Sequence, residues 1–279
     1  LVGSEMCIRD RIVAMQSDFT RLYQRSSNIF VDEQSRSYLR GAEGLATLAL
    51  LADYDADAKA DNAQDTLEDI WAREEVPYPL EDGGWLAGEV DDLQGRFNLN
   101  LLTEVAQQGE GQPRFTPAQA QFIRLLQAVT EQELGQQQAI AIMQAVGDWL
   151  DGDQQARFDG AEDDFYAGLT PAYRVANRPM ASVSELRAVK GMTAELFLAL
   201  RPFVTVWPQS AGRLNIHTAP ATVLRSIAPV DELSPLSAQD GLAQASYRCE
   251  SGFSDLQDFF DHPVLAGNKD ILQARWPSC

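Results

Sequence analysis

The stretch Arg11–Ala52, RIVAMQSDFTRLYQRSSNIFVDEQSRSYLRGAEGLATLALLA, contains no proline and has glycine only at Gly41 and Gly44. Apolar side chains recur along it at helical spacing: Ile12, Met15, Phe19, Leu22, Tyr23, Ile29, Phe30, Leu39, Leu45, Leu48 and Leu51. The spacing predicts one helix of roughly forty residues, about 60 Å long at 1.5 Å per residue. Polar residues occupy most faces of its first half, which is typical of a helix that projects from its domain.

The chain that follows this helix is predicted to form short elements. We expect a short helix over 66–73, and the Pro- and Gly-rich stretch 76–84 predicts turns. Two extended runs come next, over 85–90 and 94–101. The Asp91-Asp92 pair between them predicts that the two runs form a hairpin.

The second half of the chain is predicted to be mostly helical. Thr116 followed by Pro117 is typical of an N-cap and a first helical residue. Two helices are therefore expected over 117–129 and 131–150. After them come a long acidic loop over 151–179 and a run of short helices from Ser182 to about residue 274.

The composition narrows the class of protein. The formal net charge is -19, from 41 acidic residues against 22 Lys and Arg. Such a surplus repels phosphate backbones and makes a cation a plausible ligand. Apolar residues make up 45% and charged residues 23% of the chain, as in folded globular proteins. The sequence contains no run of about 18 consecutive apolar residues that would predict a membrane span.

The three cysteines, Cys7, Cys249 and Cys279, lack the spacing of zinc ligands. Cys249 and Cys279 could pair if the compartment oxidises thiols. They could equally remain unpaired and inert, and the sequence leaves both alternatives open.

Acidic residues gather around the motif Trp149-Leu-Asp-Gly-Asp at the end of a predicted helix. Asp151 and Asp153 flank Gly152, so the chain can turn there and direct two carboxylates at one point. Further acidic residues follow at Asp159, Glu162, Asp163 and Asp164. Calcium takes six to eight oxygens in irregular geometry, which suits such a loop, although the spacing is not that of an EF-hand. The alternative is an exposed acidic loop with aspartate caps.

Paired carboxylates could also perform acid–base chemistry, as in glycoside hydrolysis. The sequence offers no nucleophile elbow, P-loop or HExxH motif to support a hydrolase. Its two histidines, His217 and His262, have no partner pattern either. We therefore expect no enzymatic activity.

Two segments look like helix–hairpin–helix units, and they raise the alternative of a nucleic-acid-binding protein. One begins at Ser184 and includes Gly191; in the other, Thr218 is expected to cap a helix whose Val223, Leu224 and Ile227 face inward. Residues 182–228 contain five Lys or Arg and two acidic residues. Against DNA binding, the second hairpin has Ala228-Pro229 where a glycine is needed, and Pro229 lacks an N–H donor.

An ordered set of motifs resembles the general secretion pathway protein K family of bacterial type II secretion. The motifs are Asp91-Asp92-Leu-Gln-Gly-Arg-Phe-Asn-Leu-Asn, Trp149-Leu-Asp-Gly-Asp, Ala161-Glu-Asp-Asp-Phe-Tyr, Pro171-Ala-Tyr-Arg-Val-Ala-Asn-Arg-Pro-Met, Ser184-Glu-Leu-Arg-Ala-Val-Lys-Gly-Met and Leu214-Asn-Ile-His-Thr-Ala-Pro. Each motif is weak alone, but their order from about residue 36 to residue 262 is specific to this family.

The resemblance implies an α+β fold: a pilin-like long N-terminal helix on a small antiparallel sheet, with a large inserted mostly α-helical domain. It implies a minor pseudopilin that caps the tip of the pseudopilus at the periplasmic face of the inner membrane. The implied partners are the I-type and J-type minor pseudopilins, and neither nucleic acid nor a small-molecule substrate is expected. On this resemblance, the family's basic leader and apolar membrane anchor are expected to be missing from this sequence.

The resemblance also suggests site residues. The family is reported to bind calcium, which is carried here onto the acidic motif residues Asp151, Asp153, Glu162, Asp163 and Asp164. The partner interface is expected on the helix stripe formed by Ile12, Met15, Phe19, Leu22 and Ile29. The C-terminal half of that stripe, Leu39 to Leu51, is expected to pack on the protein's own sheet.

The resemblance divides the chain into four parts. Residues 1–10 are interpreted as a non-native leader, and 11–105 as the pilin-like helix and sheet. Residues 106–265 form the inserted helical domain, with its helix–hairpin–helix-like units. Residues 266–279 form a C-terminal return segment that ends before the further strands usual in the family.

Overall fold

A computed structural model describes residues 2–60, 64–73, 76–81, 83–104, 113–131, 133–209, 212–250 and 252–266. The chain forms two compact units. The first comprises Leu1–Gln64 and Glu68–Asp91, and the second comprises Asp65–Leu67 and Asp92–Cys279. The division after Asp91 lies upstream of residue 105, where the sequence analysis placed it, because the segment after Asp92 pairs with strands and helices of the second unit.

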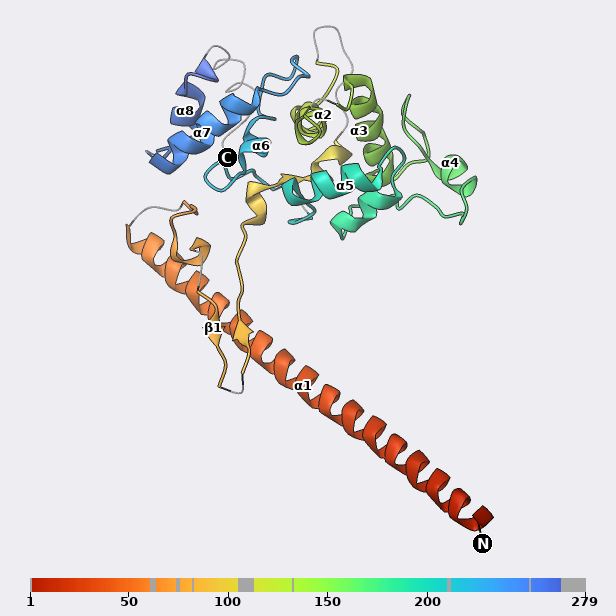
Figure 1. The fold of residues 1–279 in the computed structure, drawn as a ribbon. Helices are drawn as coiled ribbons and strands as arrows, with labels where there is room; N and C mark the ends of the chain where they lie inside the picture. Colours follow the sequence, from red (N-terminus) through yellow and green to blue (C-terminus); the bar gives the residue numbers. More distant parts are fainter. Residues whose placement is uncertain are drawn as a thin grey trace. The chain divides into compact units, whose positions relative to one another are not determined.

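The first unit is built on α1, which runs without interruption from Val2 to Ala60 and is 59 residues long (Figure 1). The helix is longer at both ends than predicted. It includes most of the presumed leader, and it continues through residues 53–60, which contain neither Pro nor Gly and three alanines. Among the described residues, no helix is long and apolar enough to cross a bilayer.

The face of α1 that packs within the first unit is not the leucine stripe. The half-buried residues of α1 follow one helical row: Gln34, Tyr38, Ala42, Ala46, Ala49, Asp53 and Asp57. Leu39, Leu45, Leu48 and Leu51 are exposed, so the expectation that they pack on the protein's own sheet is wrong. The small alanines allow backbone to approach the helix closely, which a row of leucines would prevent.

The sheet of the first unit is a two-stranded antiparallel hairpin. Strand β1 (Tyr78–Pro79) pairs with β2 (Trp85–Leu86), in the register Tyr78 to Leu86. The turn between them is closed by hydrogen bonds from the Leu80 N–H to the Gly84 carbonyl and from the Gly83 N–H to the Leu80 carbonyl. The predicted turn cluster is therefore the hairpin turn, and the hairpin predicted over 85–101 is wrong.

The 3₁₀ helix η1 (Ile70–Ala72) lies in the region where a longer helix was predicted. It buries Trp71 and contacts α1. Trp71 is the one buried residue among the described residues of the first unit.

The second unit places the segment after Asp92 against distant chain. Strand β3 (Phe97–Asn98) pairs in parallel with β4 (Val204–Thr205). Two 3₁₀ helices flank β3: η2 (Leu93–Gly95) and η3 (Leu99–Thr103). The predicted extended run 94–101 is thus a short strand between two tight turns.

The remaining elements of the second unit are helical, as predicted. They are α2 (Pro117–Val129), α3 (Gln136–Leu150), α4 (Asp163–Ala167), η4 (Val183–Ala188), α5 (Ala194–Leu200), η5 (Arg201–Phe203), α6 (Ala221–Leu224), α7 (Ala238–Glu250) and α8 (Leu256–Asp261). Thr116 caps α2 through a capping box with Gln119, and Ser182 caps η4 through one with Glu185. These sequence-local signals confirm the predicted helix starts.

The core of the second unit surrounds α2, which lies between α3 and α6 (Figure 1). All residues of α2 from Gln119 to Ala128 are buried, because neighbours cover it on several sides. Phe122 of α2 stacks on Phe97 of β3 with ring centroids 5.4 Å apart. Val223, Leu224 and Ile227 face this core, as expected. The overall fold is α+β with a large helical domain, in agreement with the sequence analysis.

Cys249 is exposed on α7. Cys279 and the rest of the proposed return segment after residue 266 lie outside the described residues. The pairing of these cysteines therefore stays an open question.

Candidate metal centre

The candidate site lies where α3 ends and the acidic loop begins. Asp148, in the last turn of α3, has a side chain that is 0% exposed. Its carboxylate accepts hydrogen bonds from the N–H groups of Arg157 at 3.1 Å and Ala161 at 2.8 Å. It also pairs with the Arg157 guanidinium at 2.9 Å. The loop after α3 is therefore folded back onto the helix that precedes it.

Three of the five residues expected to bind metal lie together. One carboxylate oxygen from each of Asp151, Asp153 and Glu162 lies within 4.8 Å of the others. Glu162 is only 6% exposed, and neither of its carboxylate oxygens has a hydrogen-bond donor. The Oδ1 atom of Asp151 is also buried without a donor. Buried carboxylate oxygens without donors are costly unless they are protonated or meet a cation, so this donor set fits calcium.

The electrostatics of the group point the same way. Burial, together with the charges of the nearby Asp148, Asp151, Asp153 and Asp163, raises the pKa of Glu162 from its ordinary value of 4.5 to about 7. Burial also raises the pKa of Asp151, and the Arg157 guanidinium opposes that shift. A divalent cation would relieve this repulsion.

Asp163 and Asp164 do not belong to the group. Asp163 Oδ1 accepts a hydrogen bond from the Val175 N–H at 3.0 Å, and Asp164 is exposed. Both lie in the first turn of α4, where a carboxylate interacts favourably with the partial positive charge of the helix N-terminus. Asp151, Asp153 and Glu162 are therefore the three of the five predicted ligands that the structure brings together, while Asp163 and Asp164 begin α4.

Asn177 is a candidate ligand that sequence reasoning missed. Its Nδ2 donates to the Asp153 carbonyl at 3.0 Å, while its Oδ1 is buried without a donor. Asn177 has a positive φ of 46°, a conformation that Asn tolerates better than most residues. The motif Pro171–Met180 contains Asn177, but nothing in the motif itself indicates a ligand.

Aromatic residues from three of the family-like motifs contact one another beside this region. Trp149 contacts Tyr166 edge-on at 5.4 Å and Tyr173 at 6.4 Å between ring centroids. The Tyr173 hydroxyl donates to the Ala188 carbonyl at 2.8 Å. These contacts hold the segments that carry Trp149, Glu162 and Asn177 against one another.

A second junction joins the first and last motifs of the set. Asp92 Oδ2 accepts hydrogen bonds from Asn215 Nδ2 at 3.0 Å and from Thr218 Oγ1 at 2.7 Å. The Asn215 N–H donates to the Gln94 carbonyl at 2.8 Å. Thr218 was predicted to cap a helix, and this is wrong: Pro220 is the N-cap of α6, while the Thr218 hydroxyl is used by Asp92.

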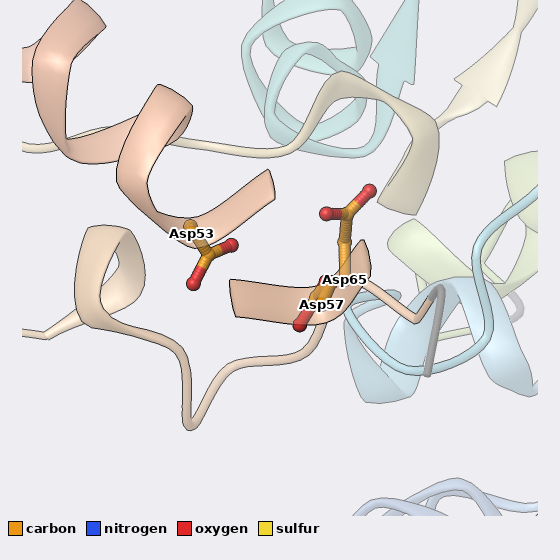
Figure 2. Close-up of side chains that lie close together, drawn as sticks. All are labelled: Asp53, Asp57 and Asp65. Carbon is orange, nitrogen blue, oxygen red and sulfur yellow. The ribbon is translucent and has the colours of Figure 1, made fainter. Parts of the chain in front are cut away.

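Acidic residues also occur on α1. Asp53 and Asp57 are one turn apart near its C-terminal end (Figure 2). Asp65, labelled in the same view, belongs to the second unit, where its carbonyl accepts from Asn215 Nδ2 at 2.9 Å. Two carboxylates from one helix supply fewer oxygens than calcium takes. The loop after α3 is therefore the better candidate site.

All five residues of the proposed interface stripe are exposed to solvent on the first unit. The exposed fractions are 59% for Ile12, 76% for Met15, 70% for Phe19, 61% for Leu22 and 64% for Ile29. Five large apolar side chains exposed along one helix are unusual for a surface that stays in water.

The raised pKa of Glu162 predicts a pH dependence of stability in chelator. Between about pH 4.5 and pH 7, Glu162 binds more protons in the folded protein than in the unfolded chain. The contribution of this proton binding to the free energy of unfolding is therefore fully present below about pH 4.5 and is lost as the pH rises through about 7. Relative to Glu162→Gln, the free energy of unfolding of the wild type should fall by roughly 2–3 kcal/mol across that window. Urea denaturation at several pH values in EGTA measures the difference; a constant difference would contradict the assignment.

Comparison with known proteins agrees with the motif set. Residues 95–209 match the family model for type II secretion system protein K. The chain is 32% identical to protein K of Klebsiella pneumoniae over 267 residues, covering 94% of this chain and 77% of that protein. It is 34% identical to protein K of Pseudomonas aeruginosa over 273 residues, covering 96% of this chain and 74% of that protein.

A solved structure shares the fold. It is the GspK–GspI–GspJ complex from the type 2 secretion system of enterotoxigenic Escherichia coli, matched with a TM-score of 0.67 and 26% identity over 87% of this chain and 79% of that chain. This chain therefore shares its fold with a chain of that complex. The chain therefore belongs to the type II secretion system protein K family, the K-type minor pseudopilins.

Proposed function

We propose that this chain is a structural subunit that caps the tip of the type II secretion pseudopilus. In this proposal it assembles with the I-type and J-type minor pseudopilins at the periplasmic face of the inner membrane and carries out no chemistry of its own. The observation that carries the proposal is the exposed apolar stripe on α1. The solved complex supports it, because there the similar K subunit is found with GspI and GspJ.

The exposed stripe favours packing against other subunits, because α1 makes few contacts within its own unit. A long helix that buries only an alanine-rich row against its hairpin has little tertiary support, whereas most helical stability in proteins comes from packing. Packing against other pilin-like helices would bury the large side chains. The second unit adds bulk that repeating subunits could not all accommodate, so a terminal position in the fibre is favoured.

Assembly can be tested on the stripe itself. The double substitution Phe19→Ser and Leu22→Ser should weaken binding to the purified I-type and J-type chains at least tenfold, because both side chains leave water on association. Both are exposed, so the thermal melting of the isolated chain should not change. Size-exclusion chromatography and calorimetry measure the association.

The matched control is Leu242→Ser, which removes an exposed leucine from α7 of the second unit. It should bind the two partner chains as the wild type does. Unchanged affinity in the stripe variant would contradict the proposed interface.

We also propose that the loop after α3 binds calcium. Asp151, Asp153 and Glu162 would hold the ion, with Asn177 Oδ1 as a further oxygen. Bound calcium would supply a positive charge to Glu162, whose two carboxylate oxygens have no hydrogen-bond donor. The support is the donor set itself, whose buried oxygens have no hydrogen-bond donors in the described part of the chain.

Thermal melting tests the calcium proposal. At a hundred times its Kd, calcium should stabilise the protein by about 2.7 kcal/mol, or roughly 5–10 °C for a domain of this size. Glu162→Gln should abolish the shift because it removes the buried ligand. Asp164→Asn, a change at an exposed carboxylate outside the group, should keep it. If neither calcium nor EGTA changes the melting temperature of the wild type, the proposed site is disproved.

The helix–hairpin–helix alternative is less well supported by the geometry. Of the basic residues in the locally basic segment, Lys190 donates to the carbonyls of Asp159 and Gly160, and Arg225 donates to the carbonyl of Leu236. The hairpin near Pro229 directs its carbonyls inward, to Arg124. Binding to a DNA duplex at low salt that weakens as salt rises would revive the alternative.

A further inference from the structure

The ion pair between Asp148 and Arg157 adjoins the proposed calcium site, because Arg157 also contacts Asp151. The Arg157 guanidinium bridges two carboxylates: Nη1 contacts Asp148 Oδ1 at 2.9 Å, and Nη2 contacts Asp151 Oδ2 at 3.0 Å. Space for it is made by glycine. A Cβ at Gly147 would collide with the guanidinium, and a Cβ at Gly160 would collide with the Asp148 carboxylate. The sequence is therefore adapted to hold this pair against α3.

The same pair closes the turn 157–161. Asp148 Oδ2 accepts from two N–H groups, those of Arg157 and Ala161, one at each end of the turn. The turn has an internal hydrogen bond from the Gly160 N–H to the Arg157 carbonyl at 3.0 Å. Two further contacts hold it from outside: the Asp159 N–H donates to Gln144 Oε1 at 2.8 Å, and Lys190 Nζ donates to the Gly160 carbonyl at 2.9 Å.

This closure determines which carboxylates meet. Asp151 follows the last residue of α3, whereas Glu162 follows the turn directly after Ala161. Fixing Ala161 on Asp148 therefore brings Glu162 back toward Asp151 and Asp153. All of these contacts are between protein groups, and neither carboxylate oxygen of Glu162 takes part in them.

Arg157 could influence the calcium affinity in two opposite ways, because it carries a positive charge and also holds the turn in place. By charge alone, Arg157 repels a cation bound to Asp151, and its removal should make calcium bind more tightly. By position, its removal frees the turn that presents Glu162, and calcium should bind more weakly. The two effects differ in sign, so one measurement decides between them.

We propose that Asp148 and Arg157 are positioning residues that preform the calcium site before the ion arrives. The inference rests on the proposed calcium site. The Arg157–Asp148 pair contributes no oxygen to the ion, and it acts by holding Glu162 opposite Asp151 and Asp153. Partners that orient metal ligands typically change affinity by roughly 10–100-fold when they are removed.

The test is calcium titration by calorimetry on the whole chain, with Arg157→Met compared with Arg178→Met. Arg178 is an exposed arginine next to Asn177, so its loss removes a nearby charge without touching the turn. We expect Arg157→Met to raise the Kd at least tenfold and Arg178→Met to leave it unchanged or slightly lower. Equal or tighter binding by Arg157→Met overturns the positioning role while leaving the calcium site intact. A wild type that gives no binding heat and no calcium-dependent melting shift overturns the site itself.

Hydrogen exchange provides a second measurement that does not depend on a variant. If the site is preformed, the amides of Arg157 and Ala161 are already protected in EGTA, and calcium changes their exchange less than threefold. Protection that appears only with calcium overturns the proposal. If Arg157→Met has no cooperative melting transition, Arg157→Lys replaces it, because a single ammonium cannot bridge both carboxylates as the guanidinium does. An unchanged Kd in that variant counts against the positioning role.

Discussion

Replacing Arg124 with methionine is expected to lower the free energy of unfolding of the second unit by about 3–5 kcal/mol. Arg124 is 0% exposed within α2, and its guanidinium donates to three carbonyls: Ser226 at 2.6 Å, Pro229 at 3.0 Å and Glu232 at 2.6 Å. Methionine fills similar space but leaves these carbonyls without a donor. Urea denaturation followed by tryptophan fluorescence measures the loss.

Arg124 stabilises the fold by donating hydrogen bonds to buried carbonyls, and its charge is not solvated by water. Burial lowers its pKa to about 10, while the charge of Glu232 opposes the shift, so it stays protonated at neutral pH. Arg124→Lys should recover only part of the stability, because one ammonium cannot reach three carbonyls as the planar guanidinium does. The control, Arg201→Met at an exposed position, should change stability by less than about 0.5 kcal/mol. A loss below 1 kcal/mol for Arg124→Met would contradict this account.

Asn100→Leu is expected to destabilise the second unit by about 2–4 kcal/mol. The Asn100 side chain is buried, and it joins three segments of the chain. Nδ2 donates to the carbonyls of Met180 at 3.2 Å and Val206 at 2.9 Å, and Oδ1 accepts from the Met180 N–H at 2.8 Å. Leucine has a similar volume but satisfies none of these backbone groups.

The change is best measured by equilibrium denaturation beside Gln138→Leu. Gln138 is exposed on α3, so that substitution removes an amide without leaving a buried group unpaired. It should cost less than about 0.5 kcal/mol. Equal effects of the two leucine substitutions would show that the hydrogen bonds of Asn100 do not stabilise the fold. The buried Asn98, whose Nδ2 donates to the Pro208 carbonyl at 2.7 Å, would then not be expected to stabilise the fold through its hydrogen bond either.

The helices were largely predictable from the sequence because their signals are local. Thr116, Pro117 and Gln119 lie within one turn and determine where α2 begins. The strands were not predictable in the same way. Phe97 pairs with Val204, which lies far away in the sequence, and no pattern near Phe97 encodes that distant partner. The leucine stripe of α1 misled for a related reason: periodicity identifies an apolar face but not what covers it.

The candidate site was predicted in part. The density of carboxylates indicated the loop, and the Asp-Gly-Asp spacing correctly placed Asp151 and Asp153 together. Asp163 lies outside this group, and composition cannot show that one of its carboxylate oxygens accepts a hydrogen bond from the Val175 N–H. Asp148, Arg157 and Asn177 were missed, since each depends on a contact that exists only after the loop has closed.

The alanine-rich row by which α1 meets its hairpin has a consequence for the life of the subunit in the cell. Because that row hides so little apolar surface, a copy without neighbours leaves leucines, phenylalanines and isoleucines of α1 open to chaperones and proteases. Orphan copies would therefore be degraded sooner than incorporated ones. Turnover would then match the abundance of this chain to the supply of its assembly partners, without any dedicated regulator.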